Sequence, residues 1–435
     1  MSRRVFLLAG IFWPLAAVGA GNLDPLHVDS RFLRDSGNRA VILRGVTTIT
    51  RNNDGKPMTM TAADYDRIRA WGFNAQQIRL EGCKLGLLPP CKPDPSYLDK
   101  LESWVAMGEE RGIYTLFKVT TYDIPGLGFN AQFGKKAWDK VWDVSTGYQD
   151  QFIAGWKPVW AHFKGRASVV GYDILNETSP GSNTPHFNHD FLLPFYRRVL
   201  AALREVDAEK LLLFQPALRA DDSLEPLGGE HVMFAPHYYP NYGDPDAMWR
   251  RLLDDGAKAK VPMLIGEYGL PNTPFKTSVI TVKAATPERD QADAALFDRN
   301  GLSTIKTWYT SVGNWSLLTD AGEEHPRLQY FSRPFPQRTA GTPKGFRFDF
   351  ATGDWTCDWE PDSAISAPTV VFVPLKRHFP RGFKITASDG LKLETDRQSA
   401  TGLKGKAKAY RYDFATEILT VSDRKVRSLE ISPLR

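Results

Sequence analysis

The sequence predicts an α/β fold, a (β/α)8 TIM barrel followed by a C-terminal antiparallel β-sandwich. From about residue 40, short β-rich runs alternate with longer amphipathic segments, as expected when crossover helices join parallel strands. After Leu318 the pattern changes to short alternating runs separated by Pro and Gly, which is typical of a sandwich. A chain of 435 residues is long enough for both domains.

The first twenty residues are predicted to be an export signal rather than part of the fold. Arg3 and Arg4 precede an apolar run that ends in small residues at 18–20, which suits a signal peptidase. The arginine pair resembles a twin-arginine signal, and an ordinary secretory signal is the alternative. A membrane anchor is the poorer interpretation, because the run is short and contains Pro14. We expect an exported bacterial protein, periplasmic or extracellular, with the barrel over 21–330 and the sandwich over 333–435.

Eight apolar runs are candidates for barrel strands, and eight strands fit a closed barrel. They cover 41–46, 74–80, 114–119, 169–175, 211–214, 232–236, 263–266 and part of 304–318. Helical spacing of apolar residues predicts the crossover helices at 62–71, 97–111, 150–163, 191–205 and 287–300. The sandwich strands are predicted at 345–350, 355–359, 369–373, 382–387, 410–413 and 418–421.

Composition narrows the classes of partner. The net charge is +5, but Lys and Arg are interspersed with Asp and Glu, so we expect no nucleic-acid partner. Cys83 and Cys91 are close enough in sequence to staple a loop in an oxidising compartment, which would leave Cys357 unpaired. No cysteine or histidine pair has zinc-finger spacing. We expect a monomer without cofactor or structural metal.

Two glutamates follow apolar strands, at the position where barrel enzymes carry their catalytic groups. The run 169–175 ends in Asn176 and Glu177, and the run 261–266 ends in Glu267. On strands four and seven of a barrel, both carboxylates would face one cleft. Retaining glycoside hydrolysis requires such a pair about 5–5.5 Å apart. We therefore predict Glu177 as acid/base and Glu267 as nucleophile.

Other polar side chains fall at further strand ends. Arg79 lies near the end of the second run, directly after Ile78, and His237 and Tyr239 follow the sixth run. A cation and a hydroxyl donor near Glu267 would favour its ionised form. An ordinary ion pair for Arg79 and a core position for His237 are the alternatives, and the shared location favours the functional interpretation.

Tryptophans supply candidate sugar platforms, because an indole face stacks on the apolar face of a pyranose. Trp308 and Trp315 lie on or near the last barrel strand. Trp138 and Trp142 fall in the third βα loop, where we expect them to line the cleft.

Together these segments resemble glycoside hydrolase family 5 of clan A, in the branch of endoglycoceramidases and glycosylceramidases. The barrel segments that carry the resemblance are 41–46, 77–79, 171–177, 237–239 and 265–269, and those of the sandwich junction are 333–343 and 368–374. The resemblance implies that Asn176 binds the sugar 2-hydroxyl and that Arg79 and Tyr239 orient Glu267. It also implies that His237 lines the cleft and that Trp315 forms a subsite platform.

The chain also departs from that pattern. Members of the family usually carry a His at the end of strand three, whereas the run 116–123 contains Lys118 and no His. Thr47 replaces an Asn, and Thr178 replaces a Pro that often follows the acid/base. Lys118 would contact an anionic or unusual substrate group, or pair with a neighbouring acid.

The predicted function is a retaining β-glycosidase that hydrolyses glycolipids by double displacement, in contact with a membrane or micelle surface. Apolar residues of the third loop, Ile124, Leu127 and Phe129, favour a lipid substrate. A β-glucosidase or endoglycanase acting on soluble or wall glycans is the alternative. A carbohydrate-binding barrel without activity is a further hypothesis, against which the two glutamates argue.

Overall fold

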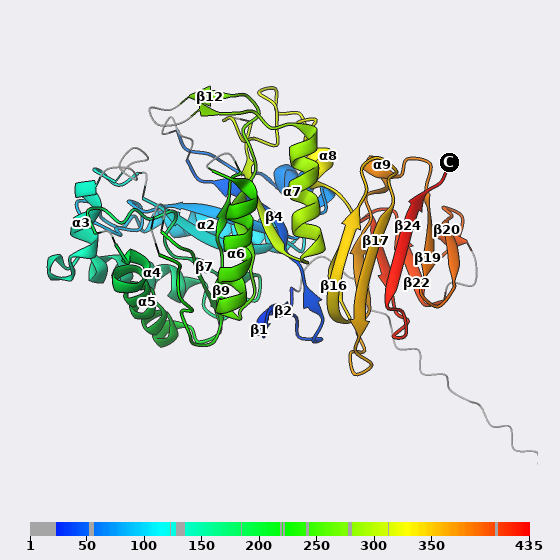
Figure 1. The fold of residues 1–435 in the computed structure, drawn as a ribbon, viewed down its shortest axis with the longest axis horizontal. Coiled ribbons are helices and arrows are strands. Elements are labelled where there is room, and N and C mark those ends of the chain that lie inside the picture. The colour runs from blue at the N-terminus through cyan, green and yellow to red at the C-terminus, as the bar shows by residue number, and fades with distance from the viewer. Residues whose placement is uncertain are drawn as a thin grey trace, which may run out of the picture.

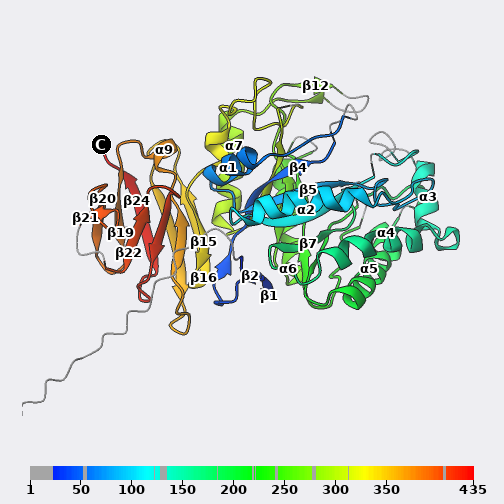
Figure 2. The same ribbon diagram turned by 180° about the vertical axis from the view of Figure 1, so that it is seen from behind.

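A computed structural model describes residues 23–435 apart from 52–55, 122, 128–134, 184, 218–219, 221, 241–242, 277–280, 312 and 405–407. The predicted export signal therefore lies outside the described residues. Figures 1 and 2 show two bodies side by side, a barrel with its helices and a smaller β-structure that ends at the C-terminus.

Parallel strands form the barrel, and the sheet order is β10-β11-β14-β4-β5-β6-β7-β8-β9. The two ends of that order, β9 and β10, follow one another in the chain, and a parallel bridge between Phe234 and Met263 joins β9 to the seventh strand. The sheet thus closes, with the sixth position divided between β9 and β10, and the predicted barrel is confirmed. The strands are β4 (Arg44–Ile49), β5 (Ala75–Glu81), β6 (Tyr114–Thr120), β7 (Val169–Asp173), β8 (Leu211–Phe214), β9 (Val232–Phe234), β10 (His237–Tyr238), β11 (Leu264–Tyr268) and β14 (Ser303–Tyr309).

Helices cover the outside of the barrel, and several of them begin at a capping residue. Thr61 and Asp64 form a capping box at α1, while Asp244 and Thr286 cap α6 and α7, each of which starts with a proline. The helices are α1 (Ala62–Ala70), α2 (Ser96–Glu109), α3 (Lys135–Trp142), α4 (Tyr148–His162), α5 (Leu193–Val206), α6 (Pro245–Ala259) and α7 (Pro287–Arg299). The helices α3 and α6 are additional to those predicted. Within the described ranges, no helix has the length and apolar composition that a membrane span requires.

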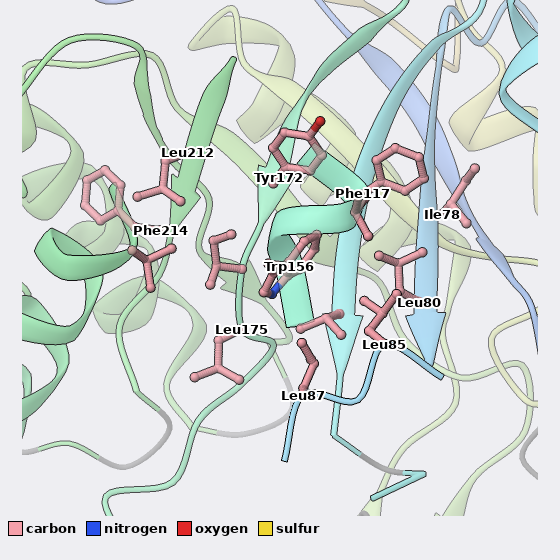
Figure 3. Packing of buried hydrophobic residues seen from close by; sticks show 14 of the residues in the cluster. Ile78, Leu80, Leu85, Leu87, Phe117, Trp156, Tyr172, Leu175, Leu212 and Phe214 are labelled. Atoms are coloured by element: carbon pink, nitrogen blue, oxygen red, sulfur yellow. The ribbon is translucent and has the colours of Figure 1, made fainter. Parts of the chain in front are cut away.

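A dense aromatic core between strands and helices determines which side chains face the barrel interior. Phe117 of β6 stacks on Tyr172 of β7 with centroids 6.0 Å apart, and Trp156 of α4 packs edge-on against Tyr172 (Figure 3). Because successive side chains of a strand point to opposite faces, the following residues, Lys118 and Asp173, point inward. The packing of Phe117 and Tyr172 on the outside of the barrel thus places the charged side chains of Lys118 and Asp173 inside it.

The C-terminal part is a two-sheet antiparallel sandwich, as predicted. One sheet has the order β16-β17-β24-β19-β20-β21 and the other β1-β2-β3-β15-β18-β23-β22. The strands are β15 (Phe335–Thr339), β16 (Gly341–Phe348), β17 (Trp355–Pro361), β18 (Thr369–Phe372), β19 (Phe383–Ala387), β20 (Lys392–Thr395), β21 (Leu403–Lys404), β22 (Tyr410–Asp413), β23 (Ile418–Val421) and β24 (Ser428–Pro433).

The N-terminal strands join the sandwich rather than the barrel. These strands are β1 (His27–Asp29), β2 (Phe32–Arg34) and β3 (Ala40–Val41), and Val41 of β3 pairs with Arg338 of β15. Figure 1 shows β1 and β2 in blue beside both bodies. The predicted run 41–46 is therefore divided: its first residue belongs to the sandwich and residues from Arg44 onward to the barrel.

Cys83 and Cys91 form a disulfide in the loop that follows β5, and Cys357 is a buried free thiol. The carboxylate of Asp123 accepts hydrogen bonds from the backbone N–H groups of Gly82, at 3.0 Å, and Cys83, at 2.7 Å. The second and third βα loops are thereby tied together beside the carboxyl ends of the strands.

Candidate active site

Glu177 and Glu267 meet at the carboxyl end of the barrel. Glu267 is the fourth residue of β11, and Glu177 lies four residues beyond the end of β7. One carboxylate oxygen of each and a ring nitrogen of His237 all lie within 4.8 Å of one another. This spacing agrees with the separation of about 5–5.5 Å in retaining glycosidases and is well below the roughly 6.5–9.5 Å of inverting ones.

Glu267 is held as an anion by two donors. Lys118 Nζ lies 2.6 Å from Glu267 Oε1, and the hydroxyl of Tyr239 donates to Oε2 at 2.6 Å. Burial alone would raise the pKa of Glu267, but the positive charge of Lys118 and the hydrogen bonds from Lys118 and Tyr239 outweigh it. They bring the pKa of Glu267 down to about 2. The carboxylate is therefore ionised and available as a nucleophile at any ordinary pH.

His237 lies between the two glutamates. Its Nδ1 is 2.7 Å from Glu177 Oε1 and 3.7 Å from Glu267 Oε2, and its Nε2 is 3.2 Å from Lys118 Nζ. Its side chain is 7% exposed. His237 thus contacts the carboxylates directly, and its functional role remains a prediction.

Glu177 and Asp173 are both hydrogen-bonded to Gln215, a residue that the sequence analysis does not predict as part of the site. Gln215 follows β8 directly, donates from Nε2 to Asp173 Oδ1 at 3.0 Å and accepts from the Glu177 backbone N–H at 3.4 Å. The backbone of Glu177 has a φ of +44°, a left-handed conformation that non-glycine residues seldom adopt. A polar residue directly after an apolar run was the available signal for Gln215. Burial raises the pKa of Asp173 to about 6, against the opposing effects of Lys118, His237 and Gln215.

Arg79 lies beside the tryptophans predicted as platforms. Its guanidinium stands 4.8 Å from the centroid of the Trp308 ring, and its Nη2 donates to the carbonyl of Arg51 at 3.5 Å. Trp308 and Trp315 are half-buried, with centroids 6.2 Å apart, and Phe275 of the hairpin β12 (Phe275–Lys276) and β13 (Thr281–Val282) packs edge-on against Trp315. Trp308 directly follows Thr307, whose hydroxyl lies 3.3 Å from that of Tyr239.

Lys118 pairs with a neighbouring acid, which was one of its two predicted roles. It is fully buried, and its partner Glu267 lies 149 positions further along the chain. Asn176 is also buried, directly before Glu177, and its backbone N–H donates to the carbonyl of Val119 at 3.2 Å. The predicted contact of Asn176 with a sugar hydroxyl remains a prediction.

The prediction that Trp138 and Trp142 line the cleft is wrong. Both are buried on α3, stacked with centroids 6.0 Å apart, and the Trp142 indole donates to the Ser179 carbonyl at 2.9 Å. Trp142 thereby holds the segment that follows Glu177, and Trp138 packs against Trp142.

The apolar loop residues need a similar correction. Ile124 and Leu127 are 1% and 5% exposed, so they pack in the core and offer no lipid-facing surface. Phe129 lies outside the described residues.

The two glutamates and His237 also have the donor atoms of a metal site. However, the Lys118 ammonium already lies 2.6 Å from Glu267 and 3.2 Å from His237. A second cation at this position would meet strong repulsion from that charge. The arrangement suits acid–base and nucleophilic chemistry better than metal coordination.

A TIM barrel with paired glutamates at the ends of strands four and seven, one of them a stabilised anion, is a retaining glycoside hydrolase. Residues 35–318 match the family description "Cellulase (glycosyl hydrolase family 5)", and residues 333–407 match "Glycoside hydrolase family 5 C-terminal domain". Because the first match covers well over half of the chain, this protein belongs to glycoside hydrolase family 5.

Among curated proteins, the chain is 24% identical to endoglycoceramidase I of Rhodococcus hoagii (strain 103S), over 85% of this chain and 83% of the relative. Among solved structures, it resembles endo-glycoceramidase II from Rhodococcus sp. in complex with ganglioside GM3. That likeness has a TM-score of 0.73 at 20% identity and covers 94% of this chain and 100% of the other. The lactosyl-enzyme intermediate of the same enzyme gives 0.72 at 21% identity, covering 93% and 100%. At these identities the solved structures establish the fold.

Proposed function

We propose that this protein hydrolyses the β-glycosidic bond between a glycan and ceramide, or a similar lipid, with retention of configuration. The observation that carries the proposal is the pair of carboxylates within 4.8 Å, one of them held ionised by Lys118 and Tyr239. The lipid aglycone is supported by the relative named endoglycoceramidase I, which aligns along both the barrel and the sandwich.

In the first step, Glu267 attacks the anomeric carbon while Glu177 gives its proton to the departing glycosidic oxygen. The bond from the anomeric carbon to the aglycone breaks, and the sugar becomes an ester of Glu267. In the second step, Glu177 removes a proton from water, which attacks the same carbon and releases Glu267. His237, whose Nδ1 lies 2.7 Å from Glu177 Oε1, holds that carboxyl group in position.

We further propose that Trp308 and Trp315 stack on sugar rings and that Asn176 binds the sugar 2-hydroxyl. The half-buried positions of both indoles, with Trp308 beside Arg79 and Trp315 next to Trp308, support a platform for sugar rings. Export to the periplasm or beyond, and transient contact with a membrane or micelle surface, are part of the same proposal. The arginine pair and apolar run of the first twenty residues support export.

The test is a substrate panel. Detergent-solubilised lactosylceramide and ganglioside are incubated beside cello- and manno-oligosaccharides, and released ceramide and glycan are measured by mass spectrometry. Glu267→Ala serves as the matched negative control. We expect intact glycan and ceramide from the glycolipids. Turnover of oligosaccharides alone would contradict the lipid aglycone and favour an endoglycanase.

A further inference from the structure

Lys118 contacts both halves of the catalytic pair, one of them directly and the other through an imidazole. Its Nζ donates to Glu267 Oε1 at 2.6 Å and lies 3.2 Å from Nε2 of His237. The opposite ring nitrogen, Nδ1, lies 2.7 Å from Glu177 Oε1. A continuous chain of contacts therefore runs from Glu267 through Lys118 and His237 to Glu177.

The hydrogens in this chain can be assigned by counting donors. A lysine ammonium has three N–H donors and no acceptor, so His237 Nε2 must supply a lone pair to Lys118. A neutral imidazole with a lone pair on Nε2 carries its proton on Nδ1. That N–H then donates to the carboxylate of Glu177. The imidazolium and the Nε2–H tautomer would both direct a hydrogen at the ammonium.

We propose that Lys118 is a positioning residue for both carboxylates. It pairs with Glu267, and by fixing the tautomer of His237 it directs an N–H at Glu177. The proposal rests on the catalytic roles proposed above for Glu177 and Glu267. It gives Lys118 a role beyond charge balance, because His237 can hold Glu177 in position only while Nε2 is occupied by a donor.

Other charged and titratable groups surround this chain and belong in any account of its pH dependence. The strand register places Lys118 opposite Arg79 of β5 and Asp173 of β7. Tyr239 donates to Glu267 from the segment after β10.

The first experiment needs no substrate. In protein labelled with 15N-histidine, two-bond 1H–15N correlations distinguish Nδ1–H from Nε2–H, and His237→Gln identifies the His237 signals among those of eight histidines. We expect the Nδ1–H tautomer at neutral pH. An Nε2–H tautomer or an imidazolium in the wild type would overturn the proposal.

The second experiment removes the ammonium in Lys118→Met. We expect the Nε2–H tautomer to become populated and the acid limb of kcat/KM, measured on aryl β-lactoside or β-cellobioside, to move up by about one to three pH units, because Glu267 loses its cation. Lys118→Arg, whose side chain also has donors and no acceptor, should retain Nδ1–H. A folded Lys118→Met variant with unchanged tautomer and unchanged acid limb would refute the proposal.

Lys210→Met is the matched control. Lys210 is also buried, but it lies at the amino end of β8 and donates to the Arg166 carbonyl at 2.7 Å, away from the catalytic pair. Its loss should change neither the tautomer nor the acid limb. Failure of the enzyme to cleave glycolipids would refute the proposed substrate while the tautomer measurement still tests Lys118, so the two proposals fail separately.

Discussion

Two buried charge clusters lie at opposite ends of the same barrel and differ in composition. At the carboxyl ends of the strands, Lys118 is the cation that contacts Glu267, with Glu177 and His237 beside it. At the amino end, Arg44 and Arg333 both pair with the single carboxylate of Asp298. The first cluster consists of groups that can exchange protons. The second has two guanidinium groups for one carboxylate, and guanidinium groups do not exchange protons.

The remaining contacts of the second cluster explain its role. Arg333 donates to the carbonyls of Tyr330, at 2.8 Å, and Ala294, at 3.3 Å, and Arg44 stands 4.3 Å from the centroid of the Phe335 ring. Arg44 begins β4 and Arg333 lies two residues before β15, so this cluster fastens the barrel to the sandwich. The comparison indicates that charge at the carboxyl ends serves chemistry, whereas charge at the amino ends serves stability.

The largest effect that tests this contrast is on turnover. Glu267→Ala should abolish hydrolysis, because no covalent intermediate can form, and Glu177→Gln should lower kcat by about 10²–10⁴-fold through loss of proton transfer. Both variants should remain folded. Steady-state kinetics and thermal melting measure the two properties, and wild-type rates in either variant would remove that glutamate from the mechanism.

Asp298→Ala should show the opposite pattern. Removing the shared carboxylate leaves Arg44 and Arg333 buried without their counter-ion, which typically costs about 3–5 kcal/mol. Urea unfolding measures the loss, and kcat of the protein that remains folded should stay within a factor of a few of wild type. Loss of kcat without loss of stability would contradict the division of roles.

The pH dependence of the unfolding free energy tests a further buried group at the carboxyl end of the barrel, Asp173. The folded-state pKa of Asp173 is about 6, above its ordinary value of 3.8, because of burial. The stability it contributes is therefore full below pH 3.8 and is lost as pH rises through about 6, on the order of 2–3 kcal/mol in total. Asp173→Asn should remove this loss. Unfolding free energies at pH 4 and pH 7 give the change for each protein, and an equal change in both would contradict the prediction.

The smallest expected effect is that of Tyr239→Phe. The variant loses one hydrogen bond to Glu267, but Lys118 still holds that carboxylate ionised. We expect a loss near the lower end of the range for hydrogen bonds to charged groups, about 1.5 kcal/mol, or about tenfold in kcat/KM. A larger loss than that of Lys118→Met would show that the hydroxyl, rather than the ammonium, controls Glu267.

Features that depend on one strand at a time were predictable. An apolar run followed by a polar residue marks the carboxyl end of a strand, and in a parallel barrel all those ends meet. Glu177, Glu267 and His237 were identified in this way before any partner was known. Gln215 carried the same signal, and it was missed because an uncharged amide offers no obvious chemistry.

Features that depend on distant partners were not predictable. The strands β1–β3 precede the barrel in sequence, yet β3 pairs with β15 some 300 positions later. The amphipathic segment 135–142 forms α3, a helix that the sequence analysis does not predict, so Trp138 and Trp142 pack in the core from a helix rather than lie in a loop. In each case the deciding contact is made by an element that is remote along the chain.

The sequence alone determined the alternation of strands and helices and the residues at the strand ends, because both follow from local periodicity and strand polarity. The tertiary structure decided which partner each strand-end residue has. Lys118 faces Glu267 and His237 only because the barrel closes with a particular register, which brings β6, β10 and β11 around one interior. That register is a property of the closed sheet, and no single segment contains it.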